Sequence, residues 1–407
     1  MSPRPRPEPP PESSAAEATQ TCRHFGVCGG CSLLDQPVRW QIHDKVEACE
    51  RLLGTFLGGQ RIRFSLPDRP QRFFRTRLLY PVRRDREGLP ITGLYEFHSH
   101  NLVRIEECRT QDLWLTELGR AAERVLRELR LEAFVPATGR GAVKGLWARL
   151  ASGTGEVLAG IVTRPGEFAA GAEFATQLQA AAEGLPQRAS RRRKLVGVVH
   201  SISERDDPFL LGDRHVPLRG RDHIVDERDG LTFRVSAGSF YQIHAGAHAL
   251  LYRPALALCG DVAGRTVIDA YGGVGAFGLR FARAGAAQVT IVEDNPSACR
   301  DAEHNLAANT IANARVVRSS FPGANLPPKP DLLVVDPPRA GLGRAGVDRA
   351  LALAPAQLLY VACDAEALAR DLVPLTAGGY RTAAVELCDL FPHTEHVELL
   401  AQLTRGD

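Results

Sequence analysis

The chain has 407 residues, more than one compact core accommodates, and this length indicates two or three domains. Its apolar fraction of 44% and charged fraction of 24% are those of an ordinary globular protein. No apolar run reaches the ~18 residues of a membrane span, and a net charge of +3 does not by itself indicate a nucleic-acid-binding protein.

The first twenty residues are rich in Pro, Glu and Ser and lack the apolar core of a secretory signal. This composition buries too little apolar surface to fold, so we expect residues 1–20 to be a disordered tail. Without a signal or a span, we expect a cytoplasmic protein with no membrane association. Nothing in the sequence implies an obligate protein partner.

Three cysteines follow the tail in short succession, Cys22, Cys28 and Cys31, with two glycines between the last two. In a cytoplasmic protein such thiols are more often ligands or catalysts than disulfides. The spacing fits zinc and iron–sulfur centres alike, and a fourth ligand must come from elsewhere. A helix is predicted over 38–53 from its i, i+3, i+4 apolar spacing, so we assign 21–60 to a cysteine segment and helix.

A mixed α+β domain is predicted over 61–225, with short strand-like runs first and then alternating helices and strands. Arginines interleave with Phe73 and Phe74, and a second basic run occupies 188–194. Arginines can neutralise RNA phosphates and aromatic rings can stack on splayed bases, although a solvated loop explains either run equally well. We expect this central domain to bind RNA.

Strands and helices alternate regularly over 226–407, which predicts a doubly wound, Rossmann-like α/β sheet. The last two strand-like runs, YRTAAVEL and HVELLAQLT, have no helix between them, so we expect them to pair antiparallel.

Ligands of such sheets bind beyond the carboxyl ends of the strands. A glycine loop, 269–275, follows the first strand, and Glu293 and Asp294 follow the second, where a carboxylate can bind ribose hydroxyls of an adenosyl cofactor or of NAD. In the stretch DPPR at 336–339, two prolines hold a stiff loop over the sheet edge, and Asp336 can face the cofactor site. It favours a methyltransferase over a dehydrogenase because it is similar to the loop that methyltransferases acting on flat bases commonly carry beside the methyl donor. A plain proline turn is the alternative.

Two further residues stand where chemistry is possible. Cys363 ends a strand before a helix, and a helix N-terminus lowers the pKa of a thiol, although a strand-end cysteine is in isolation more often structural. Period-two alternation places Glu398 on one strand face with His396 and Leu400, and Glu395 on the other. A carboxylate inside a strand is unfavourable without a task or a partner.

Five ordered motifs resemble the family of RNA uracil-C5 methyltransferases, which act on transfer and ribosomal RNA. They are SAGSFYQIH, DAYGGVGAFGL, VVDPPRAGL, YVACDAEALARDL and LFPHTEHVEL. The resemblance implies S-adenosyl-L-methionine as the cofactor, with binding residues Gln242, Tyr271, Glu293 and Asp336. Three positions depart from the family's usual Cys, Asn and Asn: Gly272, Ala276 and His244.

The resemblance also implies roles for two residues. Cys363 would add to C6 of uracil, which makes C5 nucleophilic, and Glu398 would then accept the C5 proton so that the cysteine can leave, with His396 assisting. The target uridine would have to be flipped out of its stack.

Related ribosomal-RNA enzymes hold a [4Fe-4S] cluster on a similar cysteine set plus a distant cysteine. The resemblance therefore implies a cluster on Cys22, Cys28, Cys31 and Cys108, with zinc as the alternative and a structural or RNA-binding role. Members acting on transfer RNA typically lack the cluster, so ribosomal RNA is expected and transfer RNA is the alternative. We expect no N-terminal oligonucleotide-binding barrel (TRAM domain).

Two other function classes stay open. An N-methyltransferase acting on adenine or a small molecule needs the glycine loop and the proline loop but no Cys–Glu pair. An RNA-binding or iron–sulfur scaffold would not bind S-adenosylmethionine.

Overall fold

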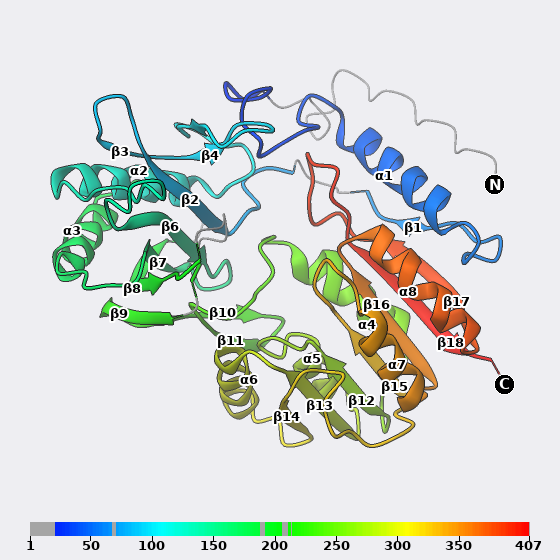
Figure 1. Ribbon diagram of the computed structural model, residues 1–407. Helices are drawn as coiled ribbons and strands as arrows, with labels where there is room; N and C mark the ends of the chain where they lie inside the picture. The colour runs from blue at the N-terminus through cyan, green and yellow to red at the C-terminus, as the bar shows by residue number, and fades with distance from the viewer. Residues whose placement is uncertain (1–20, 67–70, 188–191, 206–210, 213, 407) are drawn as a thin grey trace. The chain divides into compact units, whose positions relative to one another are not determined.

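The computed structural model describes residues 21–66, 71–187, 192–205, 211–212 and 214–406. They form two compact units (Figure 1), which we call the C-terminal unit (33–66 and 246–406) and the central unit (21–32 and 71–245, apart from its gaps). The predicted tail and two arginines of the second basic run, Arg188 and Arg191, lie outside the described residues.

The units are divided differently from the predicted domains. The helix at 38–53 joins the C-terminal unit because its buried face, with Ile42 and Val46, belongs to that unit's core. The cysteine segment joins the central unit, where Cys28 forms a β-bridge with Glu96. Local periodicity carries no signal for either long-range association.

The C-terminal unit contains the predicted alternation of strands and helices. Its elements are α1 (Val38–Leu53), β1 (Arg63–Phe64), a π-helical segment (His248–Tyr252), α4 (Arg253–Cys259), β12 (Thr266–Ala270), α5 (Gly278–Arg283), β13 (Gln288–Glu293), α6 (Pro296–Ala308), β14 (Ala314–Arg318), β15 (Leu332–Val335), α7 (Gly343–Leu353), β16 (Gln357–Ala362), α8 (Ala365–Ala377), β17 (Tyr380–Leu387) and β18 (Leu399–Arg405).

These strands form one eight-stranded sheet in the order β1-β17-β18-β16-β15-β12-β13-β14. Strands β12 to β16 pair parallel. The runs of Val, Ile and Leu in β12, β13, β15 and β16 are buried, as parallel strands covered on both faces require, whereas the edge strand β14 is only partly buried. Strand β18 pairs antiparallel with both β16 and β17. The expected doubly wound sheet with an antiparallel last strand is confirmed.

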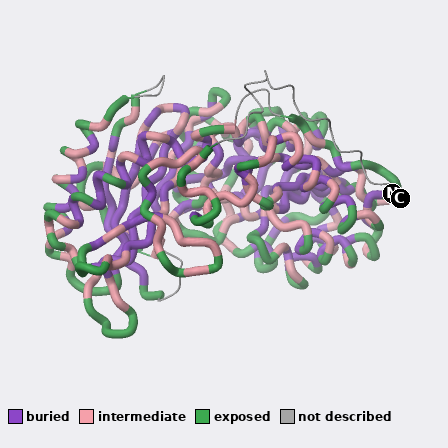
Figure 2. Tube along the Cα trace, turned by 90° about the horizontal axis from the view of Figure 1, so that it is seen from above, coloured by how far each residue is buried: buried purple, intermediate pink, exposed green. Residues whose placement is uncertain are grey.

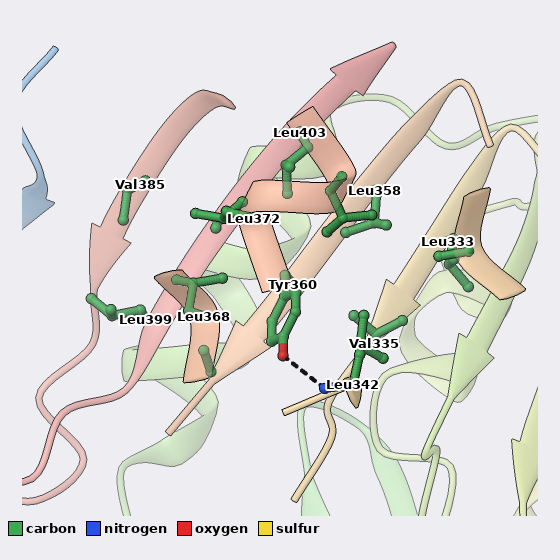
Figure 3. Close-up of a cluster of buried hydrophobic side chains, with 14 of the residues drawn as sticks. Leu333, Val335, Leu342, Leu358, Tyr360, Leu368, Leu372, Val385, Leu399 and Leu403 are labelled. Atoms are coloured by element: carbon green, nitrogen blue, oxygen red, sulfur yellow. Dashed lines mark hydrogen bonds between the residues drawn. The ribbon is translucent and has the colours of Figure 1, made fainter. Parts of the chain in front are cut away.

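Apolar side chains from the strands and from α8 form the core of this unit (Figure 3). The Tyr360 hydroxyl accepts a hydrogen bond from the Leu342 N–H at 3.1 Å (Figure 3). It donates one to Asp371 Oδ2 at 2.7 Å. These bonds tie the loop that follows β15 to β16 and α8. In each unit the buried residues follow the sheet strands (Figure 2).

The central unit has its own sheet, in the order β3-β2-β6-β7-β8-β9, with α2 and α3 packed on it. Its elements are β2 (Arg77–Arg84), β3 (Pro90–Thr92), β4 (Leu94–Tyr95), β5 (Leu102–Val103), α2 (Leu113–Glu128), β6 (Val143–Leu150), β7 (Glu156–Thr163), α3 (Gly171–Glu183), β8 (Lys194–Ile202), β9 (Arg214–Gly220), β10 (His223–Arg228) and β11 (Leu231–Ser236). Across the part of the chain described here, no helix combines the length and the apolar character needed to cross a bilayer.

Two neighbouring residues of α8 allow a matched test of this core. Leu372 is completely buried, whereas Val373 is 59% exposed. We expect Leu372→Ala to lower the free energy of unfolding by about 2–5 kcal/mol, because it removes apolar contacts and leaves a cavity. Val373→Ala should change it by less than about 0.5 kcal/mol. Denaturant unfolding measures both, and equal effects would contradict this packing.

Candidate active site

The glycine loop leaves β12 at the carboxyl edge of the sheet. Tyr271 has a left-handed backbone, φ 60°, and Gly275 has φ 84°, which glycine adopts without strain. The Gly272 N–H donates to the carbonyl of Val292 at 3.0 Å. A Cβ at Gly272 would lie 2.5 Å from Cγ2 of Ile291, so Ile291 fills the space that the family's usual cysteine would need.

Glu293 fastens this loop to the end of β13. Its carboxylate accepts hydrogen bonds from the backbone N–H groups of Gly273 (2.8 Å), Asp294 (3.0 Å) and Asn295 (2.8 Å). Burial raises the pKa of Glu293, and these backbone bonds oppose the rise. The predicted glycine loop and the predicted carboxylate therefore meet at one edge of the sheet.

Two more carboxylates lie at this edge. Asp269 is fully buried, and burial raises its pKa to about 7, with Asp336 and Glu293 adding to the rise. One of its oxygens accepts from the Gly278 N–H at 2.7 Å. Burial also raises the pKa of Asp336 to about 7. Sequence reasoning gave Asp269 no role, although an acid inside the apolar strand TVIDA was a signal.

Cys363 and Glu398 lie at the same end of the sheet. The antiparallel register pairs Ala362 of β16 with Leu399 of β18, so the next position along both strands sets Cys363 opposite Glu398. The two side chains interact electrostatically, because the Glu398 charge raises the pKa of Cys363. The fold therefore brings together the two residues that the sequence singled out for chemistry.

The expected lowering of the Cys363 pKa is wrong. Burial raises the pKa of this thiol to about 11, and the charges of Glu398 and Asp336 raise it further, whereas Arg339 opposes them. The helix N-terminus is occupied instead by the Asp364 side chain, which accepts from the Ala367 N–H at 2.9 Å. Burial of the thiol, followed by the Glu398 and Asp336 charges, thus sets the direction of its pKa shift.

Glu398 itself is 2% exposed, and its pKa lies well above the ordinary value because of burial first and the Asp336 charge second. The predicted face shared with His396 is wrong, since His396 is exposed while Glu398 is buried. Strand β18 begins only at Leu399, so period-two alternation does not extend back to these residues. Glu395 is exposed.

A tyrosine and an arginine that sequence reasoning missed lie near these acids. The buried Arg280 guanidinium lies 4.1 Å from the ring centroid of Tyr252. Burial is the largest cause of the raised Tyr252 pKa, and the charges of Asp336, Asp269 and Glu398 add to it. No local sequence signal marks either residue. Their contact brings a fixed positive charge close to the buried carboxylates.

The predicted cysteine set converges in the central unit. Burial raises the pKa of Cys31 to about 12, and repulsion from Cys108 and Cys28 adds to the rise; Cys28 in turn feels Cys108 and Cys22. A Cβ at Gly30 would lie 3.4 Å from Cys28 Sγ, so the loop packs closely on its own thiol. Over the described ranges, however, no three His, Cys, Asp or Glu side chains are arranged to hold a metal ion.

Two predicted ligand-binding residues belong to the central unit. Gln242 lies in the segment after β11, which Arg149 fastens through hydrogen bonds to the carbonyls of Ser236 (2.8 Å) and Ser239 (2.7 Å). The role of Phe74 as an open stacking platform is wrong, because it is 8% exposed and its ring stacks on His244.

The raised pKa of Asp269 makes stability depend on pH. The folded state holds its proton up to about pH 7, whereas an unfolded aspartate loses it near pH 4, so this residue's stabilisation is complete below about pH 4 and is lost as pH rises through about 7. We expect Asp269→Asn to gain at least about 1 kcal/mol of unfolding free energy relative to wild type between these limits. Exposed Asp348→Asn is the control in denaturant titrations, and equal pH profiles for wild type and Asp269→Asn would contradict the prediction.

Comparisons with known proteins agree with this geometry. The family model described as tRNA (Uracil-5-)-methyltransferase matches residues 329–405. An uncharacterized RNA methyltransferase of Caldanaerobacter subterraneus is 30% identical over 97% of this chain and 87% of the relative, and one of Gloeobacter violaceus is 32% identical over 93% and 81%. The crystal structure of Pyrococcus abyssi tRNA (uracil-54, C5)-methyltransferase in complex with S-adenosyl-L-homocysteine superposes with a TM-score of 0.73 at 25% identity, covering 93% of this chain and 85% of that one. The chain belongs to the RNA methyltransferase family of the uracil-5 methyltransferases.

Proposed function

We propose that this chain methylates C5 of a uridine in RNA through a covalent bond between Cys363 and C6 of the base. The observation that supports the proposal is the register of β16 and β18, whose last pair is Ala362 and Leu399, so that Cys363 and Glu398 each lie one residue beyond it, near Asp336. A nucleophile and a separate base at one edge are what this reaction needs and what an N-methyltransferase does not.

The carboxyl edge of the sheet also suits the methyl donor. S-adenosylmethionine supplies an activated methyl group on a cationic sulfonium. Burial raises the pKa of Asp269, Asp336 and Glu398, and the Asp336 charge adds to the rise in the other two. A nearby cation opposes such a rise. Tyr271, Glu293 and Asp336 would hold the donor, and Glu293 would accept from its ribose hydroxyls. The family resemblance adds Gln242 as a donor-binding residue.

Cys363 and Glu398 then take separate steps of the reaction. The Cys363 thiolate adds to C6, and the C5=C6 electron pair moves onto C5 and the neighbouring carbonyl. C5 forms a bond to the methyl carbon as the bond between that carbon and sulfur breaks. Glu398 takes the C5 proton, the C–H electrons restore the double bond, and the C6–S bond breaks to return the thiolate. Glu398 must be ionised to take the C5 proton, and its negative charge raises the pKa of Cys363, so the titrations of the two groups are linked.

Ribosomal RNA is the substrate we propose. The support is the cysteine set, which resembles that of ribosomal-RNA members of the family. Transfer RNA is the second candidate, and it is favoured by the likeness to the Pyrococcus enzyme, whose name specifies uracil-54 of tRNA. In the central unit the exposed ring of Phe240, two residues before Gln242, offers a stacking surface that Phe74 lacks.

A [4Fe-4S] cluster on Cys22, Cys28, Cys31 and Cys108 is part of the proposal, with zinc as the alternative. Four thiolates carry a charge that burial alone does not tolerate. The guanidinium of Arg75 opposes the rise in pKa of Cys28 and Cys31, and its buried Nε has no hydrogen-bond partner among the described residues, as a residue facing an anionic centre would. Arg75 thus suits an anionic centre, while no three of the described His, Cys, Asp or Glu side chains are arranged to hold a metal ion. A bound cluster would fasten the cysteine loop to the rest of the unit.

Loss of the Cys363 thiol should abolish the reaction while leaving the fold intact. In cells lacking this protein, we expect 5-methyluridine to disappear from one or more ribosomal sites, to return with the wild-type chain, and not to return with Cys363→Ala. Mapping in both ribosomal and transfer RNA measures this. Sites restored only in transfer RNA would move the proposal to the second substrate, and full activity of Cys363→Ala would overturn the covalent mechanism.

A matched control and a chemical trap sharpen this test. Cys259→Ser changes a buried thiol of α4 that has no proposed role and should restore methylation. RNA containing 5-fluorouridine should leave a stable adduct with the wild-type chain and none with Cys363→Ala, because Glu398 cannot remove fluorine as it removes a proton.

The cysteine set gives a separate prediction about metal content. Protein purified without oxygen should be brown and contain about four irons per chain. Cys31→Ser should lose most of this iron, because one of four ligands is gone, whereas Cys299→Ser should keep it. Metal analysis and visible absorbance measure the result. Zinc in place of iron would support the alternative metal, and no metal in any preparation would overturn the site.

A further inference from the structure

The loop that leads into Glu398 is a further feature of the C-terminal unit. It spans 389–397, between β17 and β18, and is closed at its base by a hydrogen bond of 2.8 Å from the Cys388 N–H to the Glu398 carbonyl. Glu398 precedes the first paired residue of β18, Leu399. The position of its carboxylate therefore depends on the conformation of this loop as well as on the sheet.

Helix α1 contacts the loop through two buried polar side chains. The Lys45 ammonium donates to Asp389 Oδ1 at 2.7 Å and to the carbonyl of Phe391 at 3.0 Å. Lys45 is 5% exposed, and the Asp389 side chain is 8% exposed. A desolvated ion pair with such geometry fixes its partners, because separating them leaves a buried charge without compensation.

The second contact holds the middle of the loop. The Gln41 carbonyl oxygen accepts from the backbone N–H of His393 at 2.7 Å, and its amide nitrogen lies 3.2 Å from His393 Nδ1. Gln41 is completely buried and His393 is 1% exposed. His393 has φ 67°, a left-handed backbone that is uncommon outside glycine and persists only where the surroundings enforce it.

Gln41 is itself fixed from the other side. Its amide donates to the carbonyls of Leu33 and Gln36, both at 2.8 Å, and the Leu33 N–H donates to the His393 carbonyl at 3.0 Å. Both backbone groups of His393 are therefore bonded to the segment that contains α1. The loop is held at Asp389, Phe391 and His393, which lie in its first half, after β17.

We propose that Gln41 and Lys45 are positioning residues for the base Glu398, and that α1 serves the proton-abstraction step rather than only the core. The inference rests on the proposed function, since it gives Glu398 the C5 proton. Neither residue touches the reacting atoms. Their loss would loosen the loop and displace the carboxylate, while Cys363, held at the end of β16, would still add to the base and C5 would still be methylated.

The proposal predicts a specific kinetic defect. Unmodified RNA from cells lacking this protein is incubated with the full-length chain and methyl-labelled S-adenosylmethionine, and the covalent complex is separated on a denaturing gel. Lys45→Met and Gln41→Leu should slow release of the methylated RNA by about tenfold or more, with accumulation of the labelled complex, because elimination waits for the base. Complex formation should change much less. Glu398→Gln provides the reference for the trapped state.

Controls separate positioning from stability. Lys45→Arg keeps the ion pair and should release RNA close to the wild-type rate. Arg51→Met removes an exposed cation from the same helix and should behave as wild type. Should Lys45→Met unfold because Asp389 is left buried and unpaired, Lys45→Met with Asp389→Asn removes both charges and should show the same trapped complex.

Three outcomes decide the matter. Trapping in the Gln41 and Lys45 variants supports the proposal. Folded variants that release RNA at the wild-type rate, or that lose formation and release in equal proportion, overturn it. If Glu398→Gln traps nothing and Cys363→Ala stays active, the proposed function fails instead, and this result is independent of α1.

Discussion

Desolvation of negative charge at one edge of a parallel sheet is the constraint on which the active site depends. Asp269, Asp336 and Glu398 lie where buried apolar strands end, and burial is the largest cause of the raised pKa in each. Such an arrangement is unfavourable for folding unless a cation, a proton or a hydrogen bond compensates it. A site that binds a sulfonium and moves a proton gives these carboxylates their use.

The same constraint explains why the thiol is not activated in advance. Cys363 is poised beside carboxylates that oppose its ionisation, so a reactive thiolate depends on the charge state of its neighbours. A cation bound at this edge favours the thiolate. Reactivity would then be coupled to occupancy of the site, which keeps an exposed nucleophile from forming without its substrates.

Much of this site could be predicted from the sequence because its residues lie at the ends of strands that local patterns indicate. Buried strand runs predicted the sheet, and since parallel strands end at one edge, Tyr271, Glu293 and Asp336 were expected near one another. The antiparallel pairing of β17 with β18 was predicted from the lack of a helix between them, whereas the pairing of β18 with β16, which brings Glu398 toward Cys363, was not predicted. The error at His396 arose where the strand period was extended into a loop.

What could not be predicted depends on contacts between distant segments. Gln41 and His393 are 352 positions apart, and neither motif periodicity nor a carboxylate's own neighbours reveals that α1 holds the loop before Glu398. The same holds for Arg280 against Tyr252 and for the division of the chain into units that interleave in sequence. A base on a loop gains mobility that a strand would deny it, and two buried side chains on a helix from the other end of the chain restrict that mobility. In the proposed reaction, tertiary packing thus determines the position of the base, whereas the sheet alone determines the position of the nucleophile.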